Sequence, residues 1–247
     1  MQRSGNRFCS SFNSIAKIAS TKADIDWDWP GAEAEFRRAI ALNPHYATTH
    51  HWFAVGVLGP LRRFDEALAE IQRAQELDPL SPAINVSAGE YLSLAGKSDM
   101  GIQVLQKQIS SDPAFLRARI VLAGIYISTG KLPEAIAELE TMRRLAGNEA
   151  YGVRLLGFAY ARAGRTNEAR AILGQLLELQ RQGLDHRVDI AMVQHGLGDD
   201  ESALDSLEQA VEEKASFPYM VNHKPVWSDL RLHPRAQAIL KRMNLVK

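Results

Sequence analysis

The sequence predicts an all-α solenoid in which about six antiparallel helix pairs stack side by side, followed by a C-terminal capping helix. Three observations carry this prediction. A small residue recurs at almost constant spacing, a glycine lies five residues before most of its copies, and bulky apolar residues recur at helical spacing. Together they describe a repeated unit of helix, tight turn and helix.

The repeat is clearest at a small residue that is followed four positions later by a large apolar one. Its six copies are Ala32, Ala67, Gly101, Ala135, Ala169 and Ala203. Successive copies are 35, 34, 34, 34 and 34 residues apart, a period typical of stacked repeat folds. Small side chains on one helix face let two helices approach closely, so we place each copy in the second helix of a pair.

Glycines and prolines mark the ends of the predicted helices. The glycines five residues before the small residue are Gly96, Gly130, Gly164 and Gly198, and the prolines twelve residues after it are Pro44, Pro79 and Pro113. Glycine accepts the left-handed backbone that ends a helix, and proline cannot continue a helical hydrogen-bond ladder. We therefore expect helix pairs at about 13–42, 46–77, 82–111, 115–145, 148–182 and 184–214.

The first helices of the pairs supply the bulky residues, such as Leu156 and Tyr160 in the fifth pair. One pair cannot bury such a stripe alone, so the pairs must stack. The expected organisation is an irregular start at 1–12, a repeat array at 13–214 and a C-terminal cap at 215–247. Three prolines break up the cap, and its last apolar residues are expected to cover the open end of the array. These residues are Ile239, Leu240 and Met243.

Composition excludes several function classes. The chain has 29 basic and 29 acidic residues, so no net charge attracts it to nucleic acid. Its one cysteine, Cys9, allows no internal disulfide and favours a reducing compartment, so we expect a cytoplasmic location. The longest uncharged apolar stretch, residues 52–61, is too short to span a membrane.

Catalytic or metal-binding patterns are also missing from the sequence. His50 and His51 are adjacent, and adjacent residues on a helix point in different directions and do not chelate as a pair. Asp199, Asp200 and Glu201 are expected to begin a helix, where negative charge is favoured. No phosphate-binding glycine loop or dinucleotide motif is present. The sequence therefore predicts no catalytic residue, metal or cofactor, and a protein that is not an enzyme.

The repeats resemble the tetratricopeptide repeat, most closely in the fifth copy with Leu156, Gly157, Tyr160, Gly164 and Ala169. The resemblance covers roughly residues 13–214. It implies a right-handed superhelix whose concave groove is lined by the first helix of each pair. Gly101 stands where this pattern usually has alanine, at an expected cost of about 1 kcal/mol in helix propensity.

The same resemblance implies a function, which is binding a peptide or helix of a partner protein in the groove. Counting the groove-lining positions of the family selects six candidate residues: Glu90, Arg117, Tyr151, Arg154, Phe158 and Met192. Aromatic, Arg and Met side chains of this kind are enriched at protein interfaces, although ordinary groove filling explains the same composition. The asparagine needed to grip chaperone C-termini is absent from the ninth position of these helices, so we do not expect that partner.

A narrower resemblance gives an alternative function. Residues 26–52 and 227–235 are similar to the C-terminal repeat region of bacterial winged-helix transcriptional regulators and of serine/threonine kinases. This implies a sensory or autoregulatory region separated from its effector domain. No helix-turn-helix or kinase motif occurs in the chain, so we carry over neither DNA binding nor phosphoryl transfer. Partner identity and oligomeric state are not predicted.

Overall fold

The computed structural model describes residues 18–146, 152–215 and 219–246, and every regular element in these ranges is a helix. The predicted all-α solenoid is confirmed. After a helical turn at 18–24, the array consists of α2 (Trp29–Leu42), α3 (Ala47–Phe53), the π-helix η1 (Ala54–Leu58), α4 (Phe64–Leu77), α5 (Pro82–Leu94), α6 (Ser98–Ser111), α7 (Leu116–Ser128), α8 (Leu132–Leu145), α9 (Val153–Arg162), α10 (Thr166–Arg181), α11 (Arg187–Gly196) and α12 (Asp200–Glu212). From α3 onward these helices begin and end within a few residues of the predicted pairs.

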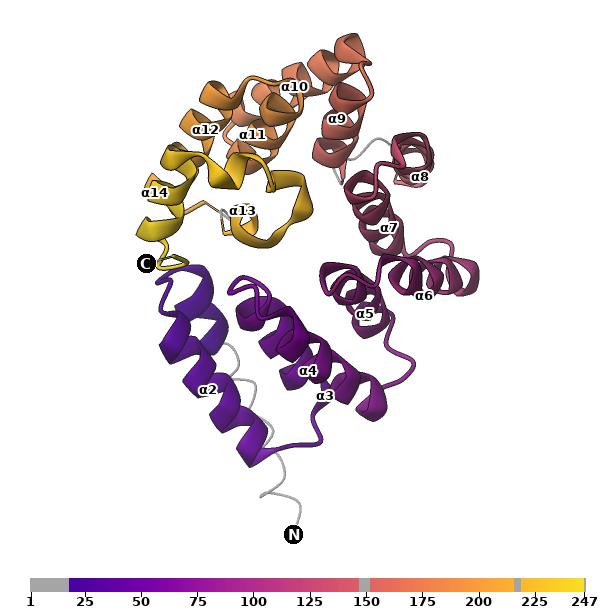
Figure 1. The fold of residues 1–247 in the computed structure, drawn as a ribbon, viewed down its shortest axis with the longest axis vertical. Coiled ribbons are helices and arrows are strands. Elements are labelled where there is room, and N and C mark those ends of the chain that lie inside the picture. Colours follow the sequence, from indigo (N-terminus) through magenta and orange to yellow (C-terminus); the bar gives the residue numbers. More distant parts are fainter. Residues whose placement is uncertain (1–17, 147–151, 216–218, 247) are drawn as a thin grey trace.

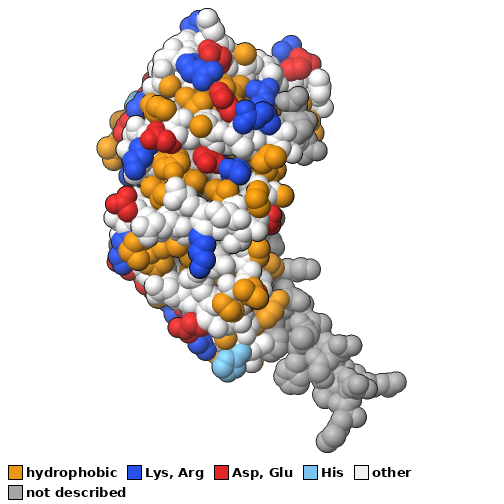
Figure 2. Space-filling model, turned by 90° about the vertical axis from the view of Figure 1, so that its right-hand side faces the viewer, with side chains coloured by type: hydrophobic (Ala, Val, Ile, Leu, Met, Phe, Trp, Pro, Cys, Tyr) orange, Lys and Arg blue, Asp and Glu red, His pale blue; other side chains and the backbone are white. Residues whose placement is uncertain are grey.

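The helix pairs follow one another around an arc, each packed against the pairs before and after it (Figure 1). Helices α5, α7, α9 and α11 lie toward the inside of the arc, and their partners α6, α8, α10 and α12 lie outside. Seen from the right of Figure 1, the outside carries small groups of hydrophobic side chains separated by charged ones (Figure 2). Apolar surface on that face is therefore divided into small patches.

Local backbone geometry explains the helix ends. The four glycines predicted to end first helices all have left-handed φ angles: Gly96 at 81°, Gly130 at 76°, Gly164 at 76° and Gly198 at 82°. The predicted start of a helix at Asp199 is also confirmed, because the Asp199 carboxylate accepts a hydrogen bond from the backbone nitrogen of Ser202. Asp28 caps α2 in the same way through Gly31.

The small residues lie in the packed interior between helices, as the repeat pattern predicts. Ala32, Ala67, Ala135, Ala169 and Ala203 are each fully buried. At Gly101 the approach is closer still, because a Cβ there would clash with the carbonyl oxygen of Gly89 in α5. Gly101 lowers helix propensity, but a larger residue could not fit in this contact between α5 and α6.

After α12 the chain turns back along the inside of the arc. We call residues 219–246 the C-terminal segment, which contains α13 (Met220–His223), the 3-10 helices η2 (Pro225–Trp227) and η3 (Leu230–Leu232), and α14 (Pro234–Arg242). Figure 1 shows α13 within the arc and α14 between α12 and α2. Ile239, Leu240 and Met243 are buried.

Helix α14 is fixed to α12 by a charged contact. The guanidinium of Arg235 donates to the carboxylates of Glu201, Asp205 and Glu208, which share one face of α12, at distances of 2.6 to 3.1 Å. The hydrogen bonds to Glu208 first, and then to Asp205, hold the pKa of the guanidinium above its ordinary value. The contact positions α14 over the end of the array.

The C-terminal segment also reaches the first helix pair, so the arc closes into a ring. The indole Nε1 of buried Trp29 in α2 donates to the backbone oxygen of Met243 at 2.6 Å. The ring of Tyr219 meets the ring of Trp29 edge-on, with centroids 5.8 Å apart. Asn244 donates to the backbone oxygen of Trp27 at 3.3 Å. Two segments far apart in the sequence therefore meet at one packed junction, which we call the ring junction.

Candidate functional site

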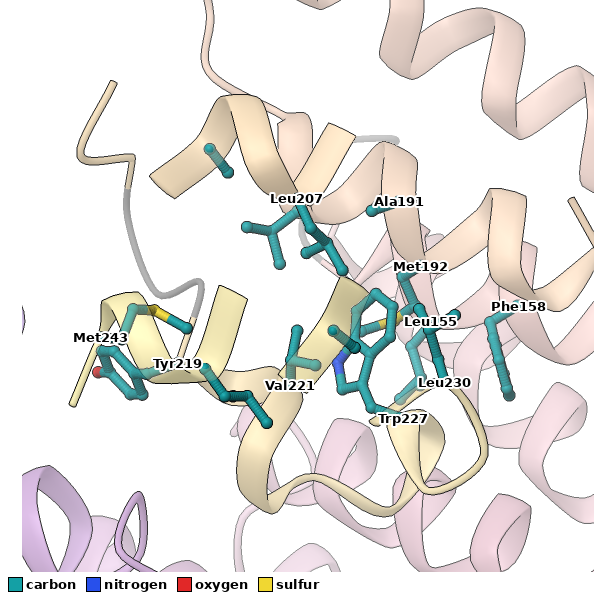
Figure 3. Packing of buried hydrophobic residues seen from close by; sticks show 14 of the residues in the cluster. Leu155, Phe158, Ala191, Met192, Leu207, Tyr219, Val221, Trp227, Leu230 and Met243 are labelled. Carbon is teal, nitrogen blue, oxygen red and sulfur yellow. The ribbon is translucent and has the colours of Figure 1, made fainter. Parts of the chain in front are cut away.

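The inner face of the arc is the candidate functional surface, and the C-terminal segment runs across it. Trp227 is fully buried against this face and stacks on His195 of α11, with centroids 5.8 Å apart and planes 15° apart. His195 in turn lies 5.9 Å from the ring of Phe158 in α9. Figure 3 shows Trp227 surrounded by Leu155, Met192 and Leu230. The inner face thus holds a polypeptide segment through an aromatic anchor.

Electrostatic contacts hold the middle of the C-terminal segment. The ammonium of Lys224 donates to the carboxylate of Glu90 in α5. Burial alone would raise the pKa of Glu90, but the positive charges of Lys224 and Arg117 outweigh it, and the pKa is lowered. Glu90 is therefore ionised and paired. The ion pair fixes Lys224 on the wall of the inner face.

Backbone recognition adds to the side-chain contacts. The Asn222 side chain, which is 3% exposed as a residue, donates to the backbone oxygen of Pro60 at 2.8 Å. The backbone oxygen of Asn222 accepts from Arg62 at 3.0 Å and from Arg231 at 3.0 Å. Pro60 and Arg62 belong to the turn before α4. This turn and the C-terminal segment contact each other's main chains, as a scaffold contacts a bound peptide.

The six residues predicted from the sequence lie in different surroundings. Glu90, Phe158 and Met192 contact or pack near the C-terminal segment, and Phe158 and Met192 are 4% and 2% exposed. Arg154 pairs with Asp189 of α11 at 3.1 Å. Arg117 is exposed at the start of α7. Tyr151 lies outside the described residues. Whether these residues bind a partner stays a prediction.

Apart from Glu90, Phe158 and Met192, several residues that hold the C-terminal segment were not predicted as site residues from the sequence. They are Trp29, Arg62, Asn222, Lys224 and Trp227. For those in the C-terminal segment a sequence signal existed. This stretch is broken by prolines, yet it contains a tryptophan and several other large apolar residues. Such residues need a surface to bury against, and a single capping helix does not provide enough of it.

An open cleft remains beside the C-terminal segment. It has a volume of about 480 Å³ and lies between the turn that joins α7 to α8, the end of α9 and residues 225–229. Phe158 and His195 form part of its wall, and Arg162 and Asp229 also line it, as an ion pair with 3.9 Å between their charged groups. Exposed opposite charges beside aromatic walls suit contact with a polypeptide.

Metal ligands do not cluster on this surface or elsewhere in the described ranges. Among residues 18–146, 152–215 and 219–246, no three His, Cys, Asp or Glu side chains come together in a way that could hold a metal ion. No helix in the same ranges has both the length and the apolar character needed to cross a membrane.

A known repeat family matches the centre of this array. Residues 92–157 match the tetratricopeptide repeat. The matched region runs from the end of α5 into α9, and so includes the helices that form the middle of the inner face. No curated protein matches the chain.

Solved structures with the tetratricopeptide-type fold extend the comparison to most of the chain. The type IV pilus biogenesis factor PilW is 16% identical with a TM-score of 0.59, covering 93% of this chain and 98% of PilW. PilF of Pseudomonas aeruginosa is 16% identical with a TM-score of 0.56, covering 86% and 96%. A thermophilic TPR protein of Thermus thermophilus is 22% identical with a TM-score of 0.57, covering 79% and 100%. At these identities the similarity establishes the fold.

Proposed function

We propose that the chain is a non-catalytic protein-interaction scaffold, which docks a peptide or a helix of a partner protein on the inner face of its repeat array. One observation carries the proposal. The inner face already holds a polypeptide segment, its own residues 219–246, through stacking on His195, an ion pair at Glu90 and contacts to main-chain oxygens. A surface that binds one segment in this way has the chemistry to bind another.

We place the partner at the part of the inner face that the C-terminal segment leaves accessible. The cleft of about 480 Å³ lies there, with Phe158 in its wall. Arg117, exposed on α7, and the partly exposed Arg154 on α9 lie on neighbouring inner helices. Both arginines stand near the beginnings of α7 and α9, whereas the cleft lies near the ends of these helices, so a partner that reaches from the cleft to the arginines would run along the inner face. Arginine is common among the residues that dominate protein interfaces. These two arginines are the residues whose loss tests the placement.

The test starts with capture of partners from the native host by the full-length chain, followed by affinity measurement with the purified partner. Arg117→Ala and Arg154→Ala are expected to weaken binding at least about tenfold each, since interface hot spots contribute roughly 2 kcal/mol or more. Arg170→Ala on the outer helix α10 is the control, because Arg170 is exposed there. Wild-type affinity in both inner-face variants, with the fold intact, would reject this placement.

The second candidate function is a sensory region of a bacterial regulator, inferred from residues 26–52 and 227–235. One contact favours it: Trp27 and Trp29 of the first stretch meet residues 243–244, which follow the second stretch by eight and nine residues, at the ring junction. An effector-domain gene immediately upstream of the coding sequence would support this candidate. Partner binding by the isolated chain, with no such neighbour, would support the scaffold alone.

A further inference from the structure

Two arginines from distant parts of the chain converge near the ring junction. The Nη1 atoms of Arg62, before α4, and Arg231, in η3, each donate to the backbone oxygen of Asn222 at 3.0 Å. Because both nitrogens contact one oxygen, they are no more than about 6 Å apart. Two like charges at this separation repel each other, and an anion bound beside them would reduce the repulsion.

Both guanidinium groups are held in place before any ligand arrives. Arg62 has a left-handed backbone with φ of 60°, and its guanidinium lies over the ring of Phe64 at 5.3 Å. Arg62 lies five residues before Ala67, the helix-end position at which later repeats have a left-handed glycine, so its backbone conformation is set by the repeat. The backbone oxygen of Arg231 accepts from Gln237 at 2.6 Å, which fixes η3 against α14. The pair is therefore preorganised.

The charge of this pair is not balanced by the side chains around it. Among the described residues, neither Arg62 nor Arg231 forms an ion pair, whereas nearby Arg235 contacts three carboxylates. The adjacent Lys224 is already paired with the ionised carboxylate of Glu90, so this acid is not a partner of the two arginines. Burial first and then the charge of Arg62 lower the pKa of Arg231. Arg62 and Arg231 therefore stand beside each other without a carboxylate partner in the described ranges.

Solvent reaches the pair, since Arg62 is exposed and Arg231 is half-buried. A guanidinium uses its planar set of N–H donors to bind oxyanions, and two of them suit a group of about two negative charges. A phosphate group carries a charge of about −1.5 to −2 near neutral pH, whereas a carboxylate carries one. The number of charges and donors therefore favours phosphate over carboxylate.

We propose that Arg62 and Arg231 form a binding site for a phosphate group, either free or as a monoester, at the junction of the first repeats and the C-terminal segment. The site exists only when the ring is closed, because one arginine comes from each side of the junction. A ligand that binds only the closed form stabilises it by mass action. Phosphate binding therefore holds the C-terminal segment on the inner face.

The site is tested by thermal melting and titration calorimetry of the full-length chain. The probes are inorganic phosphate, O-phosphoserine and acetate at matched ionic strength. We expect phosphate or phosphoserine to raise the melting temperature and acetate to leave it nearly unchanged. In Arg62→Gln and Arg231→Gln, affinity for the phosphate probe is expected to fall at least about tenfold, since charge-assisted hydrogen bonds are lost.

Two further variants separate the site from general charge effects. Arg170→Gln removes the same charge from exposed α10 and is expected to bind phosphate as the wild type does. Arg62→Lys keeps the charge and loses the fork of donors, so partial retention of affinity is expected. Tighter binding of free phosphate than of phosphoserine assigns a free anion, and the reverse assigns a monoester. Equal responses to phosphate and acetate, or unchanged affinity in both glutamine variants, overturn the proposal.

Discussion

At the scale of single residues, buried histidines separate into two kinds according to their neighbours. His50 contacts the carboxylate of Glu70 at 2.6 Å, and this hydrogen bond raises the pKa of His50 despite its burial. His51 has the hydroxyl of Ser87 as its partner, at 2.9 Å. Burial, with a smaller effect of the charge on Arg117, lowers the pKa of His51 to about 4. The pKa values of these two adjacent histidines are therefore shifted in opposite directions.

His51 is predicted to make the fold less stable as the pH falls. In the unfolded chain its pKa is about 6.5, so between about pH 6.5 and pH 4 only the unfolded form binds the proton. Lowering the pH from about 7 to about 5 should remove roughly 2 kcal/mol through this residue. Urea unfolding of the wild type and of His51→Gln at both pH values measures the difference. Parallel pH slopes in the two proteins would contradict this assignment.

At the scale of helices, the close contact between α5 and α6 shows why a repeat position departs from its pattern. Gly101 occupies a position where alanine is usual, and helix propensity alone would favour replacing it. The carbonyl oxygen of Gly89 stands where it would clash with a Cβ. Packing between the two helices therefore outweighs the propensity of one.

Alanine substitution is predicted to have opposite effects on stability at two helical glycines, because only one of them lies in a close contact. Gly101→Ala should destabilise the fold by about 1–3 kcal/mol, because the added methyl overpacks the contact. Gly174→Ala in α10 should stabilise it by about 0.5–1 kcal/mol, because nothing lies within 4 Å of the added methyl. Chemical denaturation of both variants gives the two free energies of unfolding. A stabilised Gly101→Ala protein would place α5 and α6 farther apart than described.

At the scale of the whole molecule, the ring junction decides whether the array is an open arc or a closed ring. Trp29 connects the two sides through its hydrogen bond to Met243 and its edge contact with Tyr219. Charge contacts at Lys224 and Arg235 fix the C-terminal segment elsewhere along its length. Loss of the junction would therefore free the end of the segment more than its middle.

Trp29→Ala is predicted to open the ring. The variant loses a side chain that is 2% exposed and should cost roughly 3–5 kcal/mol of stability. Small-angle scattering should show a larger radius of gyration than that of the wild type. Trp52→Ala is the control, since Trp52 is 37% exposed and its loss should leave both quantities nearly unchanged. Identical scattering and melting of the two variants would show that Trp29 does not close the ring.

The helix pairs could be predicted from the order of residues, because each pair depends on residues close together in the chain. The glycines that end helices, the alanines between them and the cap at Asp199 all act over a few residues, and their positions were predicted. The six candidate groove residues were named by counting along each helix in the frame of the resembled family, and whether they bind a partner stays a prediction. Local periodicity tells which way a side chain faces within its own pair.

What lies against the inner face could be learned only from the folded array. Trp29 and Met243 are 214 residues apart, and no periodic pattern connects them. The path of residues 219–246 depends on the accumulated curvature of the stacked pairs, because only that curvature brings the last pair near the first. Arg62 and Arg231 meet for this reason, and so do Glu90 and Lys224. Long-range contacts of this kind are set by the shape of the whole array, which no single repeat encodes.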